Sequence, residues 1–232
     1  AIGRLFWESS RAPSKGMPDD AAQTLAALRA RPSILMVGTV EPRKGHAQAL
    51  AAFDLLWQQG VDANLVIVGK HGWMVDALVD RLKSHGEKGQ RLFWLAGISD
   101  EMLLEVYQAS NALLAASEGE GFGLPLIEAA QHQMPIIARK LPVFEEIAGE
   151  HAFWFDGLQA QDLASALKTW IELFHAGKAP DSRNMPWLTW EQSAEELKQV
   201  IWGDDWLLHY PDLPADASCV AGNTDHSASI AV

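Results

Sequence analysis

The sequence of 232 residues carries 18 Lys and Arg against 30 Asp and Glu, which gives a formal net charge of −12, and 48% of it is hydrophobic. This composition is ordinary for a globular protein with a buried core, and the length suits one large domain or two small ones. The negative charge excludes nucleic acid as a partner, because no basic stripe could neutralise its phosphates. A small anionic ligand stays compatible, since it needs only a local pair of cations.

The cellular compartment follows from the cysteine count and from the apolar runs. The single cysteine, Cys219, excludes an intrachain disulfide and fits a reducing compartment. No apolar run approaches the ~18 residues that a membrane span needs, and "AIGRLFWESSR" does not resemble a signal peptide. We therefore expect a cytoplasmic protein without a transmembrane segment, at most peripheral at the inner face of the plasma membrane.

In chain order, residues 1–30 are predicted to be a connecting segment with one helix near 21–30. Short, continuously apolar runs follow, typical of strands buried on both faces, at 33–38, 64–69, 91–97, 111–117, 135–139 and 152–155. Helical patterns separate them at 46–60, 99–110, 124–133 and 160–174, and a last helix begins at Thr189 with capping-box spacing to Gln192.

This alternation predicts an α/β fold, a Rossmann-like doubly wound parallel sheet spanning residues 31–202. Residues 203–232 contain five aspartates and no Lys or Arg. We expect an acidic tail there, disordered from about residue 211.

The predicted ligand site lies where a doubly wound sheet reverses its strand order, between the first and fourth strands. The loop after the first strand is "TVEPRKG" (39–45), and it supplies the adjacent cations Arg43 and Lys44. The loop after the fourth is "EGEGFG" (118–123), whose glycine amides precede a helix N-terminus. Two cations and a glycine-lined helix start indicate a pyrophosphate site.

The carboxylates beside this loop need another partner, because they would repel a pyrophosphate. Glu120 lies in the loop and Glu128 about one turn inside the following helix. Carboxylates in such places accept hydrogen bonds from hydroxyl groups. A ligand with hydroxyls at both ends and phosphates between them is a nucleotide sugar.

Other interpretations stay open at this level. The glutamates fit solvated loop and helix-dipole positions, and Arg43–Lys44 fits an exposed turn. A nicotinamide or flavin dinucleotide would need G-x-G-x-x-G after the first strand, and that pattern is absent there. The histidines show no metal-ligand spacing, so we expect neither a metal nor a cofactor.

"VGTVEPRKG" (37–45) and "EGFGLPLIE" (120–128) together resemble the retaining glycosyltransferases with the GT-B fold, whose hallmark is two glutamates separated by seven residues. The resemblance implies that Glu120 holds donor-sugar hydroxyls, that Glu128 holds the ribose, and that Lys44, with Arg43, pairs with the pyrophosphate. The amides of Gly121, Phe122, Gly123 and Leu124 would meet the sugar and phosphates. The loop "GKHGW", which begins at Gly69, would lie near the base.

Two departures from the family pattern limit the functional conclusions that the resemblance supports. Many members have Arg where this chain has Thr39, so the role of Arg43 is open. The chain also contains one Rossmann-like half, which corresponds to the C-terminal, donor-binding half of a GT-B enzyme. A glycan or lipid-linked acceptor would bind the missing half, and the isolated half is expected to bind donor but to transfer sugar poorly.

The subgroup that the motifs resemble most transfers mannose or rhamnose in bacterial polysaccharide and lipopolysaccharide assembly, which favours GDP-mannose or another GDP-sugar as donor. Two alternatives remain: a non-catalytic module that binds nucleotide sugars or a protein partner, and another GT-B enzyme such as a phosphorylase or epimerase.

Overall fold

The structure is a computed structural model, and it describes residues 16–202 of the chain. Of the described residues, those up to Trp187 belong to one compact unit, which contains the sheet, and residues 188–202 belong to a second. The expectations for residues 1–15 and for the tail 203–232 lie outside the described part.

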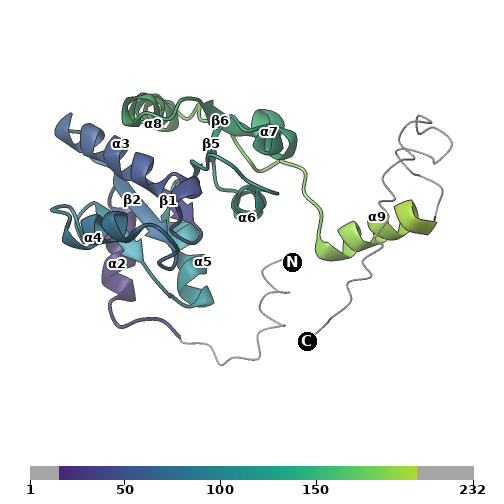
Figure 1. The fold of residues 1–232 in the computed structure, drawn as a ribbon, viewed down its shortest axis with the longest axis horizontal. Helices are drawn as coiled ribbons and strands as arrows, with labels where there is room; N and C mark the ends of the chain where they lie inside the picture. Colours follow the sequence, from purple (N-terminus) through teal and green to yellow (C-terminus); the bar gives the residue numbers. More distant parts are fainter. Residues whose placement is uncertain (1–15, 203–232) are drawn as a thin grey trace, which may run out of the picture. The chain divides into compact units, whose positions relative to one another are not determined.

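The sheet has six parallel strands in the order β3-β2-β1-β4-β5-β6 (Figure 1), which confirms the predicted fold class. The strands are β1 (Ser33–Val37), β2 (Asn64–Val68), β3 (Leu92–Leu95), β4 (Ala112–Ala115), β5 (Ile136–Arg139) and β6 (Ala152–Phe155). Each run that was expected to form a strand does so, although several strands end earlier than predicted. The residues beyond those ends, such as Ala116 and Ser117 after β4, form loops at the carboxyl edge of the sheet.

Burial on both faces explains why these strands are continuously apolar. All five residues of β2 are buried, and Ile34 of β1 pairs with Leu65 of β2 on one side and with Ala112 of β4 on the other. Ile34 and Met36 face the core beneath α3 and α8, whereas Leu35, between them, is buried outside that cluster. Since side chains alternate along a strand, each face of the sheet has its own apolar contact with helices.

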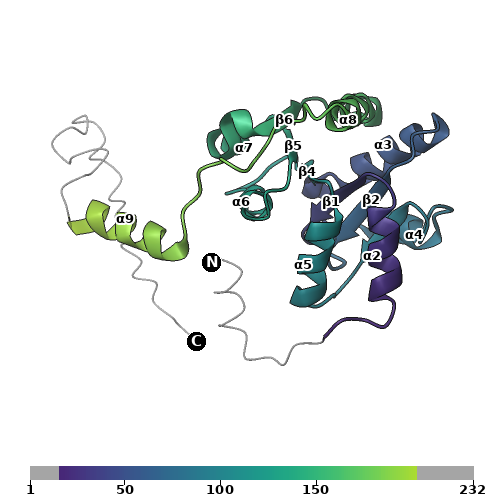
Figure 2. The same ribbon diagram turned by 180° about the vertical axis from the view of Figure 1, so that it is seen from behind.

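The helices of the sheet unit are α2 (Ala21–Arg29), α3 (His46–Gln58), α4 (Asp76–Ser84), α5 (Asp100–Ala109), α6 (Leu124–Gln131), α7 (Pro142–Ala148) and α8 (Ala160–His175), with short 3-10 turns η1 (Pro42–Lys44) and η2 (Gly149–His151). Helix α3 packs against α8, and α2 packs against α5. Strands β1 and β2 lie between α3 and the pair formed by α2 and α5 (Figures 1 and 2). Helices α4 and α7 were not predicted, because each is short and buries only two apolar residues.

Two helix starts behave as their sequences predict. The Ser99 hydroxyl accepts a hydrogen bond from the Met102 amide at the start of α5. At the start of α9 (Trp190–Trp202), Thr189 and Gln192 exchange hydrogen bonds of 2.8 and 3.1 Å between side chain and backbone. Both arrangements satisfy amide groups that have no partner in the first helical turn.

Candidate nucleotide-sugar site

Strands β1 and β4 are neighbours, so the loops that follow them meet at the carboxyl edge of the sheet. The loops are in direct contact, because the Glu118 amide donates to the Arg43 carbonyl. Gly45 ends η1 with φ +73°, and a Cβ there would lie 2.3 Å from the Ala116 carbonyl oxygen. Only glycine combines this left-handed conformation with this close approach. The predicted convergence of the two loops is therefore present.

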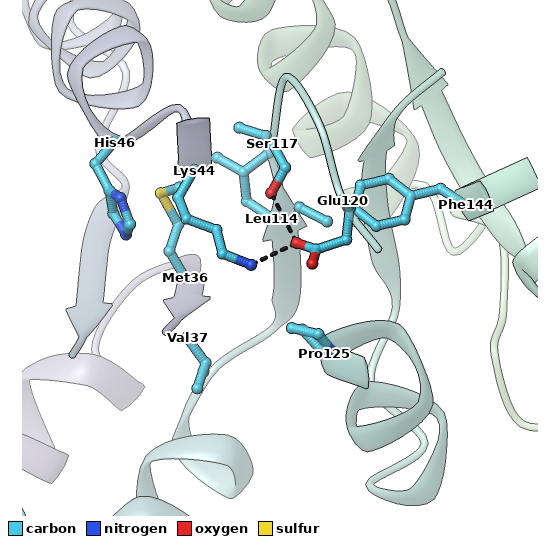
Figure 3. Close-up of a pocket in the computed structure, with 11 residues that line it drawn as sticks. Met36, Val37, Lys44, His46, Leu114, Ser117, Glu120, Pro125 and Phe144 are labelled. Carbon is cyan, nitrogen blue, oxygen red and sulfur yellow. Dashed lines mark hydrogen bonds and ion pairs between the residues drawn. The ribbon is translucent and has the colours of Figure 1, made fainter. Parts of the chain in front are cut away.

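A pocket with about 310 Å³ of empty space, part of it open to solvent, lies between the two loops (Figure 3). Apolar side chains from the ends of β1 and β4 form part of its wall, and its polar side chains come from the two loops and from the start of α3. Its lining consists of Met36, Val37, Lys44, His46, Leu114, Ala115, Ala116, Ser117, Glu120, Pro125 and Phe144. Of the predicted site residues, Lys44 and Glu120 line it.

Glu120 is the centre of a charged cluster at this pocket. The Lys44 ammonium donates to Glu120 Oε2, and these two side chains are only 15% and 12% exposed. Arg43 Nη1 lies 3.5 Å from Glu120 Oε1 and donates to the Gly119 carbonyl at 3.2 Å. The Ser117 hydroxyl and Glu120 Oε2 are 3.4 Å apart (Figure 3). Residues about 76 positions apart in the chain thus form one polar group.

The charge state of Glu120 reflects two opposing effects. Burial raises the pKa of its carboxyl group, whereas the hydrogen bond and the positive charge of Lys44 lower it. The Gly121 amide, 3.2 Å from Oε1, and the charge of Arg43 act in the same direction as Lys44. The net pKa is below its ordinary value, so Glu120 is an ionised hydrogen-bond acceptor at neutral pH.

His46 is the first residue of α3, and its side chain is 1% exposed. Burial lowers the pKa of its imidazole to about 4; the nearby Glu41 backbone opposes this effect, and the charge of Lys44 adds to it. Neither ring nitrogen makes a hydrogen bond within residues 16–202. The wall of the pocket therefore contains a neutral imidazole close to the Glu41 backbone.

The glycine loop leads into α6 through a left-handed residue. Gly123 is the N-cap with φ +81°, and a Cβ there would lie 3.1 Å from the Phe144 and Ile147 side chains. Phe122 and Leu124 are exposed. The amides at the start of α6 thus lie in an accessible loop, at the positively polarised end of the helix.

Glu128 lies one turn into α6, as predicted, but outside the pocket lining. Its Oε2 accepts a hydrogen bond of 3.0 Å from the Tyr107 hydroxyl, and the side chain is half-buried. Burial raises the pKa of Glu128, and the Tyr107 hydrogen bond partly opposes this rise. Glu128 and Glu120 thus have different hydrogen-bond partners.

The two remaining predicted residues lie at neighbouring strand ends, also outside the pocket lining. Thr39 is exposed. A Cβ on Gly69 would lie 1.8 Å from the Gly38 carbonyl oxygen, so the ends of β1 and β2 approach too closely there for any other residue. Gly69 therefore has a structural reason to be glycine, whatever its distance from a ligand.

The Arg139 side chain stabilises the loop after β4 by hydrogen bonds to its backbone. Arg139 ends β5, is 4% exposed, and donates to the Ala116 and Ser117 carbonyls at 3.1 and 3.0 Å. It also donates to the Gly157 carbonyl and to Gln48 Oε1, and its guanidinium lies 4.9 Å from the Phe155 ring centre. One buried side chain therefore joins the β4 loop, α3 and the loop before α8.

Sequence reasoning missed Ser117 and His46 as members of the site. Ser117 is the first hydroxyl after β4, and His46 directly follows Lys44–Gly45, so position next to the two loops was the available signal. In the described range 16–202, no group of three or more His, Cys, Asp or Glu could hold a metal ion. None of the helices described there has the length and apolar character needed to cross a membrane.

The strand order defines a Rossmann-like domain, with the charged pocket as its candidate ligand site. The chain belongs to the family described as glycosyl transferases group 1, whose model matches residues 21–179. Its fold resembles the C-terminal domain of a group 1 glycosyl transferase (LpcC) from Francisella tularensis, with a TM-score of 0.57, 19% identity, and coverage of 78% of this chain and 94% of that one. Sucrose-phosphate synthase from Thermosynechococcus elongatus gives a TM-score of 0.62 at 24% identity, over 80% of this chain and 48% of that chain.

Sequence relatives include the serotype-specific mannosyltransferase WbdA of Escherichia coli, which is 57% identical over 185 residues. That alignment covers 80% of this chain and 23% of the relative, so the chain spans less than a quarter of the length of WbdA. The O-antigen chain mannosyltransferase B of Escherichia coli is 32% identical over 120 residues, or 50% of this chain and 30% of that protein. These comparisons confirm the predicted resemblance to the GT-B glycosyltransferases.

Proposed function

We propose that this chain is the donor-binding domain of a retaining glycosyltransferase that moves a hexose from a nucleoside-diphosphate sugar to a glycan or lipid-linked acceptor in polysaccharide assembly. The observation that carries this proposal is the cluster of Lys44, Arg43 and Glu120 at the reversal point of the sheet. Cations at such a point suit a diphosphate, and a fixed carboxylate suits sugar hydroxyls. The 57% identity to a mannosyltransferase favours mannose as the hexose and GDP-mannose as the donor.

The cluster explains how a metal-free site could stabilise a leaving diphosphate. Lys44 has three ammonium donors, of which Glu120 takes one, so two can turn toward phosphate oxygens. As the bond from the sugar to the diphosphate breaks, negative charge grows on the leaving group. Lys44 and Arg43, held in place beforehand by Glu120, would stabilise that charge at low reorganisation cost.

The glycine loop would supply the uncharged contacts. The amides of residues 121–124 precede or begin α6, and the left-handed Gly123 turns the chain into that helix. Backbone amides at a helix N-terminus attract phosphate oxygens. Glu120 would hold hydroxyls of the hexose, and Glu128, one turn into α6, would hold the ribose.

The boundaries proposed for this domain follow from packing. Helix α2 was expected to be part of a connecting segment at residues 1–30, yet its Leu25 and Leu28 are buried, and the family match begins at residue 21. We therefore extend the proposed donor-binding domain, first expected at residues 31–202, to include α2, and end it at Trp187, where the compact unit of the sheet ends. The acceptor-binding half would come from a part of the protein that this chain does not contain.

Calorimetric titration with GDP, UDP and ADP, with and without magnesium, tests the binding part of the proposal. The expected result is metal-independent binding of GDP, weakened about tenfold to a hundredfold in Lys44→Ala, because a charge-assisted hydrogen bond is lost. Lys168→Ala, on the exposed side of α8, is the matched control and should bind like wild type. Equal affinity of the two variants would contradict the assignment of Lys44.

A second experiment separates an enzyme from a binding module. In the longer protein that contains this domain, Glu120→Gln and Lys44→Ala should abolish mannose transfer from GDP-mannose to an acceptor. Intact transfer by both variants would contradict the catalytic proposal. It would leave the alternative of a domain that binds nucleotide sugars without taking part in the chemistry.

A further inference from the structure

Tyr107 and Glu128 form a hydrogen bond that lies outside the charged cluster around Glu120. The Tyr107 hydroxyl of α5 donates to Glu128 Oε2 of α6 at 3.0 Å. The Tyr107 ring is 4% exposed and stacks on His132, with ring centres 4.4 Å apart and planes 19° from parallel. His132 follows Glu128 by four residues, so it lies one turn further along the same side of the helix. The ring therefore holds the hydroxyl in one place.

This hydrogen bond uses one oxygen of the Glu128 carboxylate and leaves the other oxygen available to a ligand. Oε2 accepts from Tyr107, whereas Oε1 has no hydrogen-bond partner among residues 16–202. Oε1 is also absent from the set of enclosed polar atoms without partners, so it reaches solvent. A carboxylate fixed through one oxygen, with the other open, has a defined direction in which it can accept a ligand hydroxyl.

The proton in this contact belongs to Tyr107. Burial, together with the charge and hydrogen bond of Glu128, raises the pKa of Tyr107 well above its ordinary value, so the phenol is a donor at every physiological pH. Burial raises the pKa of Glu128, and the Tyr107 hydrogen bond lowers it. The phenol thus favours the ionised carboxylate, which is the form that accepts from hydroxyls through both oxygens.

We propose that Tyr107 is a positioning residue, which orients Glu128 so that Oε1 meets a ribose hydroxyl of the nucleotide. This inference rests on the proposed function, because it needs a nucleoside diphosphate in the site. Alternatively, the same hydrogen bond could serve only to hold α5 and α6 together. In that case its loss would change nucleotide affinity equally, whichever hydroxyls the nucleotide carries.

The test uses Tyr107→Phe, which keeps the ring, its burial and its stack on His132 and removes only the hydroxyl. Calorimetry gives the affinity of wild type, Tyr107→Phe and Glu128→Gln for GDP and for 2′,3′-dideoxy-GDP. Wild type should prefer GDP by about tenfold to a hundredfold, because a hydroxyl on a carboxylate is a charge-assisted hydrogen bond. Both variants should lose most of this preference, and the double variant should lose no more than either single one.

Each outcome decides the question. If Tyr107→Phe keeps the wild-type preference, or weakens both nucleotides equally, Tyr107 is only structural and the inference is wrong. If wild type binds both nucleotides equally, Glu128 makes no hydrogen bond to the ribose hydroxyls and the inference is wrong. The proposed donor site would still stand. If wild type binds no nucleoside diphosphate, the proposed function fails, and this inference fails with it.

Discussion

The Glu118 amide donates a hydrogen bond of 2.8 Å to the Arg43 carbonyl, which joins the loops after β1 and β4 across 75 positions of sequence. The side chains of Lys44 and Glu120, one and two residues further along these loops, also pair. The backbone thus holds the two loops in contact, and the charged side chains lie on these loops. The geometry of the site can therefore be tested by substituting the charged residues, the side chains that support the loops and the glycines.

The pKa of Glu120 depends on Lys44. We expect Lys44→Met to raise it above its wild-type value, because burial would then lack its main opposing interaction. Carbon-13 NMR titration of the Glu120 carboxyl measures this directly. Lys168→Met should leave the Glu120 titration unchanged, and an unchanged pKa in Lys44→Met would show that the pair does not persist in solution.

The stability of the domain should depend on His46 between pH 6.5 and 4. The imidazole pKa is about 4 in the folded chain and about 6.5 when unfolded, so in this window the unfolded state binds one more proton. Stability therefore falls as the pH falls, by roughly 3 kcal/mol from this group alone.

The variant His46→Gln cannot take up that proton. Comparing urea unfolding of wild type and His46→Gln at several pH values isolates the contribution, since other groups titrate alike in both. The advantage of wild type over the variant should shrink as the pH falls from 7 to 4. A constant difference would mean that His46 titrates normally in the folded chain.

Arg139 should be a large contributor to stability. Arg139→Met would leave the carbonyls of Ala116 and Ser117 without their side-chain donor, at a cost on the order of 3 kcal/mol in the free energy of unfolding. Arg183→Met, at an exposed pair with Asp181, is the matched control and should unfold like wild type, because solvent screens such a pair. Denaturant unfolding of both variants checks this, and equal small losses would contradict the supporting role of Arg139.

The close approach of β1 and β2 predicts a steric effect at Gly69. A Cβ there would lie 1.8 Å from the Gly38 carbonyl, so Gly69→Ala should destabilise the fold by about 3 kcal/mol or more. Gly86→Ala is the control, because a Cβ at Gly86 meets nothing within 4 Å. Thermal melting should separate the two variants clearly, and similar melting temperatures would show that the strand ends can move apart.

Much of the architecture could be predicted from local patterns. Continuously apolar runs such as "NLVIVG" mark strands buried on both faces, and the short connections between strands and helices favour a parallel, doubly wound sheet. The same patterns predicted that the Arg43–Lys44 loop and the glycine loop would meet. Helices α4 and α7 were missed because two buried apolar residues are too few to show a helical period.

The sequence by itself determined the kind of fold, the edge of the sheet where a ligand would bind, and the residue types present there. The tertiary structure alone decided which side chains meet: Lys44 with Glu120, Tyr107 with Glu128, Arg139 with the carbonyls after β4, and His46 with no partner among the described residues. The physical reason is that sequence patterns report only on residues close together in the chain. Periodicity reports which face of an element is buried, whereas contacts between residues far apart in the chain depend on strand order, on loop conformation and on where a left-handed glycine lets two backbones approach.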